Sequence, residues 1–184
     1  MAYQFAGFFC CGDETALSAA ATNWPSCSVR HLSQPFCGFG VACARPIDSG
    51  TKEETATIEQ QIQQVRSGLI PWSRNFPELT FVYLSAQCFG GDCLYGGYAC
   101  RNGMVLVEEA FDDNDNWDAS RSSLRRLLQF LGLETDYFEP FTRGYFDRSQ
   151  AGTWSSIHYS PGHFCKANVG HSSRALKRKV MLAH

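Results

Sequence analysis

The sequence lacks the short motifs that identify common enzyme classes. Its 184 residues contain no G-x-S-x-G, no glycine-rich phosphate loop ending in Lys-Ser/Thr, no H-E-x-x-H and no G-x-G-x-x-G. These absences argue against an α/β-hydrolase, a P-loop nucleotidase, a zinc peptidase of the H-E-x-x-H type and a dinucleotide-binding enzyme. Nine cysteines occur without any Cys-x-x-Cys pair, which argues against a thioredoxin-type redox site. We therefore predict no catalytic residue and no cofactor.

Long hydrophobic runs are also missing. No window approaches the ~18 uninterrupted apolar residues of a membrane-spanning helix, so a membrane partner is not expected. The opening segment, MAYQFAGFFCCGDE, has no basic residue ahead of its apolar run, which is unlike a secretory signal. We expect a cytoplasmic protein whose cysteines are reduced thiols, most of them packed as small core residues.

Charge is scarce and unevenly distributed. Charged residues make up 18% of the chain, and the net charge is −2. Residues 148–184 contain six basic residues and no acid, so residues 1–147 carry ten basic residues against all eighteen acids. A basic tail can bind nucleic acid, or it can lie on the acidic body of its own chain. We favour the second alternative, because no aromatic platform for single-strand binding lies among the basic residues.

The strongest structural pattern covers residues 79–111. Two reversals, Gly90-Gly91 and Asn102-Gly103, separate three apolar runs, and Asn-Gly between such runs is the strongest local signal for a β-hairpin. We predict a three-stranded antiparallel meander over about 80–110. Both faces of its strands are largely apolar, so the sheet should be covered on both sides.

The two turns also predict the register of this meander. Cys88 should face Cys93, and Cys100 should pair with Val105. Because side chains alternate along a strand, each face should carry its own apolar set. One face should show Phe81, Tyr83, Leu94, Tyr98, Val105 and Val107, and the other Val82, Leu84, Ala86, Tyr95, Ala99 and Leu106.

Two helices are predicted before the meander. Asp13 is a suitable N-cap for a helix that runs to about Asn23. Thr51 opens a capping-box pattern, and the helix behind it should close at Gly68 and Pro71. The apolar stripe of this second helix consists of Ile58, Ile62, Val65 and Leu69.

A third helix should follow the meander. Asp118 or Ser120 is expected to cap its start, and Gly132 is the expected residue just past its end. Between them lies a clear stripe at helical spacing, formed by Leu124, Leu127, Leu128 and Leu131.

Together these patterns predict an α+β fold. Further strands are expected at about 3–11, 28–33 and 36–45, which gives the order β-α-β-β-α-β-β-β-α. Strands that come in runs favour a mainly antiparallel sheet with about three packed helices. We predict one domain over residues 1–147, with an irregular strand at 137–146, and a loosely structured basic C-terminal extension over 148–184.

The C-terminal extension holds the densest group of candidate metal ligands: His158, His163, Cys165 and His171. Imidazole and thiolate groups suit zinc, copper or nickel. Their spacing matches no zinc-finger pattern, and the surrounding segment has weak predicted structure, so we favour a loop with scattered histidines over a metal site.

Two other metal motifs are incomplete. Cys88, Cys93 and Cys100 could bind zinc only with a fourth ligand from a distant part of the chain. The acidic run from Asp112 resembles the start of an EF-hand loop, but Trp117 and Ser123 stand where that loop needs Gly and Glu. We expect small packed thiols in the first case and a solvated acidic loop in the second.

Our leading functional hypothesis is a non-enzymatic protein-binding module, such as an inhibitor or immunity-type protein for a basic partner. Residues 1–147 are acidic and rich in aromatics, and aromatic residues exposed on the surface would form a binding patch. The alternative is a metal- or thiol-dependent enzyme that uses the cysteines and the 158–171 cluster; the oligomeric state is left open. The candidate aromatics are Trp72, Phe76, Tyr83, Phe89, Tyr95 and Tyr98, with Tyr137, Phe138, Phe141, Tyr145 and Phe146.

Overall fold

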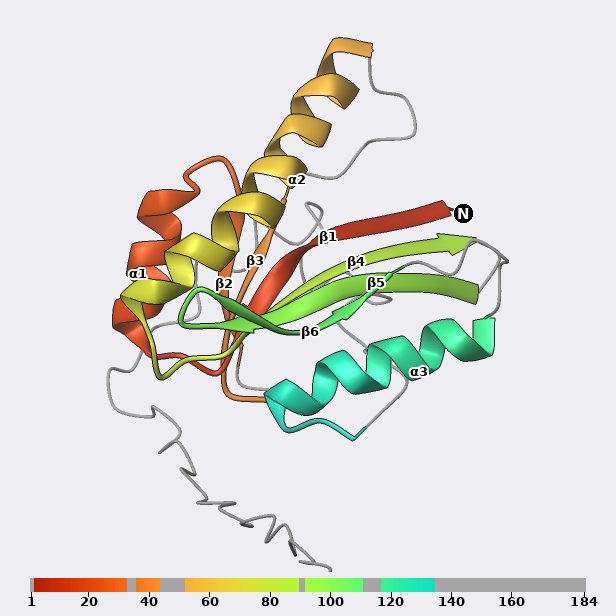
Figure 1. The fold of residues 1–184 in the computed structure, drawn as a ribbon. Coiled ribbons are helices and arrows are strands. Elements are labelled where there is room, and N and C mark those ends of the chain that lie inside the picture. Colours follow the sequence, from red (N-terminus) through yellow and green to blue (C-terminus); the bar gives the residue numbers. More distant parts are fainter. Residues whose placement is uncertain (1, 33–35, 44–51, 90–91, 111–116, 135–184) are drawn as a thin grey trace, which may run out of the picture.

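A computed structural model describes residues 2–32, 36–43, 52–89, 92–110 and 117–134 (Figure 1). The strands are β1 (Ala2–Cys10), β2 (Ser28–Leu32), β3 (Gly38–Ala42), β4 (Phe81–Phe89), β5 (Asp92–Arg101) and β6 (Met104–Glu109). The α-helices are α1 (Glu14–Asn23), α2 (Lys52–Trp72) and α3 (Trp117–Leu128), with short 3-10 turns η1 (Ser73–Asn75) and η2 (Gln129–Leu131). The predicted α+β class and element order are confirmed. The proposed strand at 137–146, the acidic loop at 112–116 and the 148–184 extension lie outside the described residues.

The first strand lies in the middle of the sheet. The strand order is β2-β3-β1-β4-β5-β6, and every neighbouring pair is antiparallel. Both flanking strands reach the apolar half of β1: Phe8 pairs with Val41 of β3 and with Tyr83 of β4. This strand is therefore buried on both faces and both edges there, which explains why its sequence is almost entirely apolar.

Helices cover the two faces of the sheet separately. In Figure 1, α3 lies on one side of the sheet, and α1 and α2 lie on the other. Alternate residues of β1 enter the two layers, with Phe9 packed on the α3 side and Phe8 on the side of α1 and α2. The predicted coverage of both faces is confirmed.

The meander follows its predicted register, with one correction. Asn102 and Gly103 have φ angles of 50° and 75°, which suit the expected type I′ turn, and Cys100 pairs with Val105. A bulge between Ala99 and Cys100 then shifts the register. Val107 consequently packs with the α3-side cluster instead of sharing a face with Val105, because the extra residue reverses the alternation.

The structure extends α2 beyond its predicted end. The helix continues through Gly68 and Pro71 to Trp72. Pro71 stands in the last turn, where it removes only one intrahelical hydrogen bond. Trp72 packs edge-on against Trp24, with ring centroids 4.8 Å apart, so tertiary contacts hold the final turn in place. Of the predicted stripe, Val65 and Leu69 are buried.

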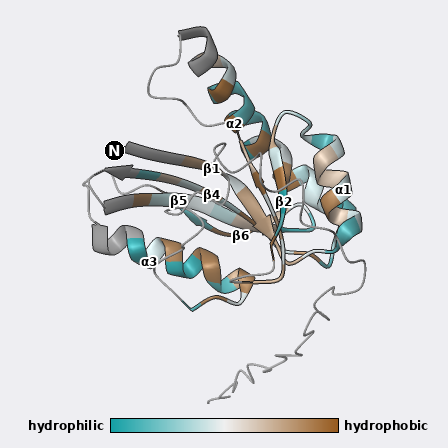
Figure 2. Ribbon diagram, turned by 180° about the vertical axis from the view of Figure 1, so that it is seen from behind, coloured by the Kyte–Doolittle hydropathy of each residue, from teal (hydrophilic) through white to brown (hydrophobic). Residues whose placement is uncertain are grey.

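The third helix matches its predicted stripe and C-terminal cap. All four stripe leucines are buried, and α3 alternates between hydrophobic and hydrophilic segments along its length (Figure 2). Gly132 has a φ of 74°, and the Leu133 N–H donates to the Leu128 carbonyl in the manner of a Schellman cap. The helix begins at Trp117, before either predicted cap.

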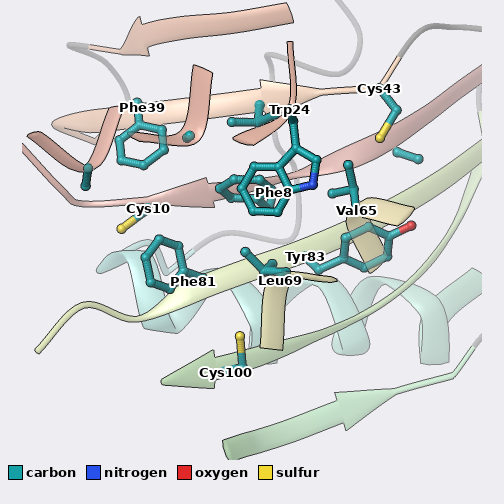
Figure 3. Close-up of a cluster of buried hydrophobic side chains, with 14 of the residues drawn as sticks. Phe8, Cys10, Trp24, Phe39, Cys43, Val65, Leu69, Phe81, Tyr83 and Cys100 are labelled. Atoms are coloured by element: carbon teal, nitrogen blue, oxygen red, sulfur yellow. The ribbon is translucent and has the colours of Figure 1, made fainter. Parts of the chain in front are cut away.

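Of the eleven candidate aromatics, five belong to the core clusters or pack against them, and the side chains of the other six lie outside what the structure describes. Tyr83, Tyr95 and Tyr98 are buried. Trp72 and Phe76 belong to an aromatic cluster with Phe8, Trp24 and Phe81, in which neighbouring rings meet at tilted or edge-on angles. Figure 3 shows Phe8 and Trp24 at the centre of this layer. Aromatic enrichment here serves the packing of α1 and α2 onto the sheet.

No helix among the described residues is long and apolar enough to cross a membrane.

Replacing Leu128 with Ala tests the packing of α3. We expect the free energy of unfolding to fall by ~2–5 kcal/mol, because a fully buried leucine leaves a cavity. Urea denaturation gives this value. Gln129→Ala is the control, since Gln129 is exposed and its replacement should change stability by less than ~0.5 kcal/mol. Equal losses in the two variants would contradict the packing described here.

Candidate functional site

The most unusual surface of the described structure is the outer edge of the sheet at β6. The large hydrophobic side chains that stand exposed are Met104 (62%), Val105 (44%), Leu106 (41%) and Phe130 (38%). Three of them are consecutive on β6, and the fourth follows α3. Phe130 lies apart from β6, in η2, which contacts β4. We call Met104, Val105 and Leu106 the β6 edge.

The position of β6 explains the exposure. It is the last strand of the sheet, and among the described residues no strand pairs with its outer side. An edge strand presents unpaired N–H and C=O groups to its surroundings. At the other edge, β2 is only five residues long and carries Arg30 and His31, which are features that discourage strand pairing. β6, by contrast, carries no charged residue from Met104 to Val107.

A buried serine fixes the start of β6. The Ser73 Oγ atom accepts a hydrogen bond from the Gly103 N–H (2.8 Å) and donates one to the Ile70 carbonyl (2.7 Å). The turn before Met104 is therefore attached to the end of α2. Nearby, the Tyr98 hydroxyl donates to the Arg66 carbonyl and ties β5 to the same helix.

An ion pair fixes the other end of β6. Glu109 accepts hydrogen bonds from the Arg126 guanidinium, with Nε–Oε1 and Nη2–Oε2 distances of 2.5 and 2.8 Å, and a further bond from the Ser123 hydroxyl. The bonds from Arg126 lower the pKa of the Glu109 carboxyl. Phe130 lies in η2, which contacts α3 and β4. Both ends of the strand are thus held, and a partner strand would meet a preorganised surface.

The predicted metal ligands are not among the residues that the structure describes. His158, His163, Cys165 and His171 lie outside the described residues. Within those residues, no group of three or more His, Cys, Asp or Glu side chains could hold a metal ion. The backbone register does place Cys88 opposite Cys93, as expected.

Buried thiols line the layer under α1 and α2. Cys10, Cys43 and Cys100 are buried in the cluster around Phe8, and Figure 3 shows their sulfur atoms at its margins. Burial raises the pKa of Cys10 well above its ordinary value and that of Cys100 to about 11. Cys10 and Cys100 are therefore protonated, neutral thiols that pack in the core. Cys11 is exposed and donates to the Leu131 carbonyl (3.8 Å).

Two cysteines depart from the expectation of inert thiols. Cys37 is disulfide-bonded, so the prediction of reduced cysteines is wrong at this position. Cys27 is free and half-buried, and a hydrogen bond from the Cys43 thiol lowers its pKa. Sequence patterns gave no sign of either, because the spacing of these cysteines matches no known motif.

Comparison with known proteins identifies no matching family model, no curated protein of significant similarity and no solved structure with a significant match.

The Glu109–Arg126 pair predicts an acid-dependent contribution to stability. A lowered folded-state pKa stabilises the fold above the ordinary carboxyl value of 4.5, and this contribution is lost as the pH falls through the lowered value. We expect Glu109→Gln to be less stable than the wild type at neutral pH and to approach it in acid. Urea denaturation across pH 3–7 measures the difference. The control is Glu108→Gln, since Glu108 is exposed on the opposite face of the strand; the same convergence there would contradict the assignment.

Proposed function

We propose that this protein is a non-enzymatic protein-binding module that takes up an extended segment of a basic partner protein along β6. An inhibitor or an immunity-type protein would work in this way. The observation that carries the proposal is the β6 edge: an unpaired strand whose apolar side chains are exposed and whose two ends are anchored.

Backbone pairing would supply the affinity. In β-augmentation, an extended peptide adds a strand to an exposed edge, its main chain bonds to the free N–H and C=O groups, and its side chains meet those of the edge strand. Met104, Val105 and Leu106 offer apolar contacts on both faces of such a strand pair.

Charge supports a basic partner. Residues 1–147 carry eighteen acidic against ten basic residues. Glu108 is exposed on β6 itself, and Asp112, Asp113 and Asp115 follow the strand in sequence. The negative electrostatic potential of this excess of acidic residues would attract a basic protein and repel acidic ones.

The test compares two charge-matched double variants. Val105→Lys with Leu106→Lys places two positive charges on exposed positions of the edge, and Gln63→Lys with Gln64→Lys places two on the exposed side of α2. Each protein is used to capture partners from the source cells. A captured protein is then purified, and its dissociation constant is measured by calorimetry at low and high salt.

We expect a basic partner that binds the wild type and the α2 variant equally. Its affinity for the edge variant should be lower than for the wild type by at least about tenfold, which corresponds to ~1.4 kcal/mol. Its affinity for the wild type should fall as the salt concentration rises. A partner that binds both variants equally would contradict the role of β6. A wild-type dimer that dissociates in the edge variant would instead make the edge a contact between copies of this chain.

Metal content distinguishes the alternative enzyme. We expect the purified protein to contain no stoichiometric zinc, copper or nickel. Stoichiometric metal that disappears when His158, His163 and Cys165 are replaced by Ala would overturn the proposal and favour a metal-dependent function.

A further inference from the structure

Cys27 and Cys43 face each other at the end of the β2–β3 hairpin. In the register of this strand pair, Val29 lies opposite Val41 and Ser28 opposite Ala42. Extending this register by one residue places Cys27 opposite Cys43. Both side chains pack with the cluster on the α1 and α2 side of the sheet, and a hydrogen bond joins the two thiols. Two free thiols are therefore direct neighbours.

The backbone geometry suits a bond between them. The Cys43 N–H donates to the Ala6 carbonyl of β1 (2.9 Å), and the Cys27 N–H donates to the Trp24 carbonyl (3.0 Å). Neither backbone N–H bonds to the opposing residue, so this is a non-hydrogen-bonded pair, for which Cα atoms lie ~4.5 Å apart. Disulfides span Cα separations of ~4.4–6.8 Å. The two sulfurs can be joined without moving the strands apart.

The two thiols are chemically unequal. Cys27 is half-buried and accepts hydrogen bonds from Cys43 and Ser26, which lower its pKa. Cys43 is buried, and its bond to Cys27 and its burial raise its pKa. Cys27 is thus the better thiolate, and Cys43 holds its proton beside it. A nucleophilic thiol next to a second, protonated thiol is the arrangement of a redox-sensing pair.

We propose that Cys27 and Cys43 form a peroxide-sensitive dithiol that closes to a disulfide across the β2–β3 pair. Hydrogen peroxide is the oxidant that fits best, because it is small enough for a half-buried sulfur beside Trp24, where a bulky disulfide would meet the aromatic cluster. This inference is independent of the β6 edge and goes beyond the proposed binding function.

The chemistry balances in two steps. The Cys27 thiolate attacks one peroxide oxygen, an S–O bond forms, and the O–O bond breaks; the departing hydroxide leaves as water with the proton that Cys27 had released. The Cys43 sulfur then attacks the Cys27 sulfur, the S–S bond forms, and the S–O bond breaks. The second hydroxide leaves as water with the Cys43 proton. Two thiols are oxidised to one disulfide while one peroxide is reduced to two waters.

The product would staple the edge strand β2 to β3. β2 is a five-residue strand at the end of the sheet, and among the described elements its main contacts are with β3 and α1. A disulfide at Cys27, directly before its first residue, would hinder the separation of this strand from β3.

Exposed Cys11 provides an internal control in the same molecule. The folded, full-length protein is treated with hydrogen peroxide for increasing times, remaining thiols are alkylated, and the protein is digested without reduction for mass spectrometry. Cleavage after Glu14 separates Cys11 from Cys27, and cleavage after Phe39 separates Cys37 from Cys43. The peptides therefore report Cys11, together with its neighbour Cys10, separately from Cys27, and Cys43 separately from Cys37.

We expect a Cys27–Cys43 cross-link, reversed by dithiothreitol, and faster loss of the Cys27 thiol than of the Cys11 thiol, because hydrogen bonds lower the pKa of Cys27 while partial burial raises that of Cys11. Cys43→Ser should abolish the cross-link and leave Cys27 as a sulfenic acid that a 1,3-diketone reagent labels. Cys11→Ser should leave the cross-link unchanged.

Two results would overturn the proposal. One is a Cys27 thiol that reacts no faster than Cys11 in the wild-type protein, a comparison that does not depend on any variant folding. The other is a peroxide-induced link from Cys27 to a cysteine other than Cys43.

Discussion

The structure depends on the need of β1 to bury both of its faces. Phe5 and Phe9 point to one side, and Phe8 and Cys10 to the other, and all four are buried. A strand with this pattern is stable only in the middle of a sheet with a layer of helices on each side. β1 therefore lies in the interior of the sheet, with β3 and β4 on its two flanks. The helices α1 and α2 cover one face of the sheet, and α3 covers the other. The aromatic rings around Phe8 and Trp24 fill the layer between the sheet and the helices α1 and α2.

A sheet built outward from its centre ends in two edges, and the two are treated differently. The β2 edge is short and polar. At the other end, β6 lies at the limit of the covering helices, and its apolar residues remain in contact with solvent. Ser73 and Arg126 anchor the two ends of β6 to helices on opposite faces of the sheet. Because the anchored β6 is already ordered, it loses little conformational entropy when a partner strand pairs with it, and this favours binding at the exposed edge.

The cysteines divide by burial and by neighbours. Cys10 and Cys100 act as small apolar residues, since burial keeps them protonated. Cys27 differs because the strand register brings a second thiol against it at a half-buried position. Cysteine therefore serves as a packing residue at positions such as Cys10 and Cys100, whereas we propose a redox role for the Cys27–Cys43 pair. The sheet register, more than the number of cysteines, separates these roles.

Local sequence determined the elements and their order. The Asn102-Gly103 turn, the Asp13 cap and the Leu124–Leu131 stripe each depend on neighbouring residues alone, so each could be recognised from the chain. Tertiary structure decided the rest. The continuation of α2 to Trp72, the bulge that turns Val107 inward and the burial of the aromatics depend on contacts between distant segments. The β6 edge and the Cys27–Cys43 pair were equally out of reach, because strand order and cross-strand neighbours are set by how the whole sheet packs, which no local pattern records.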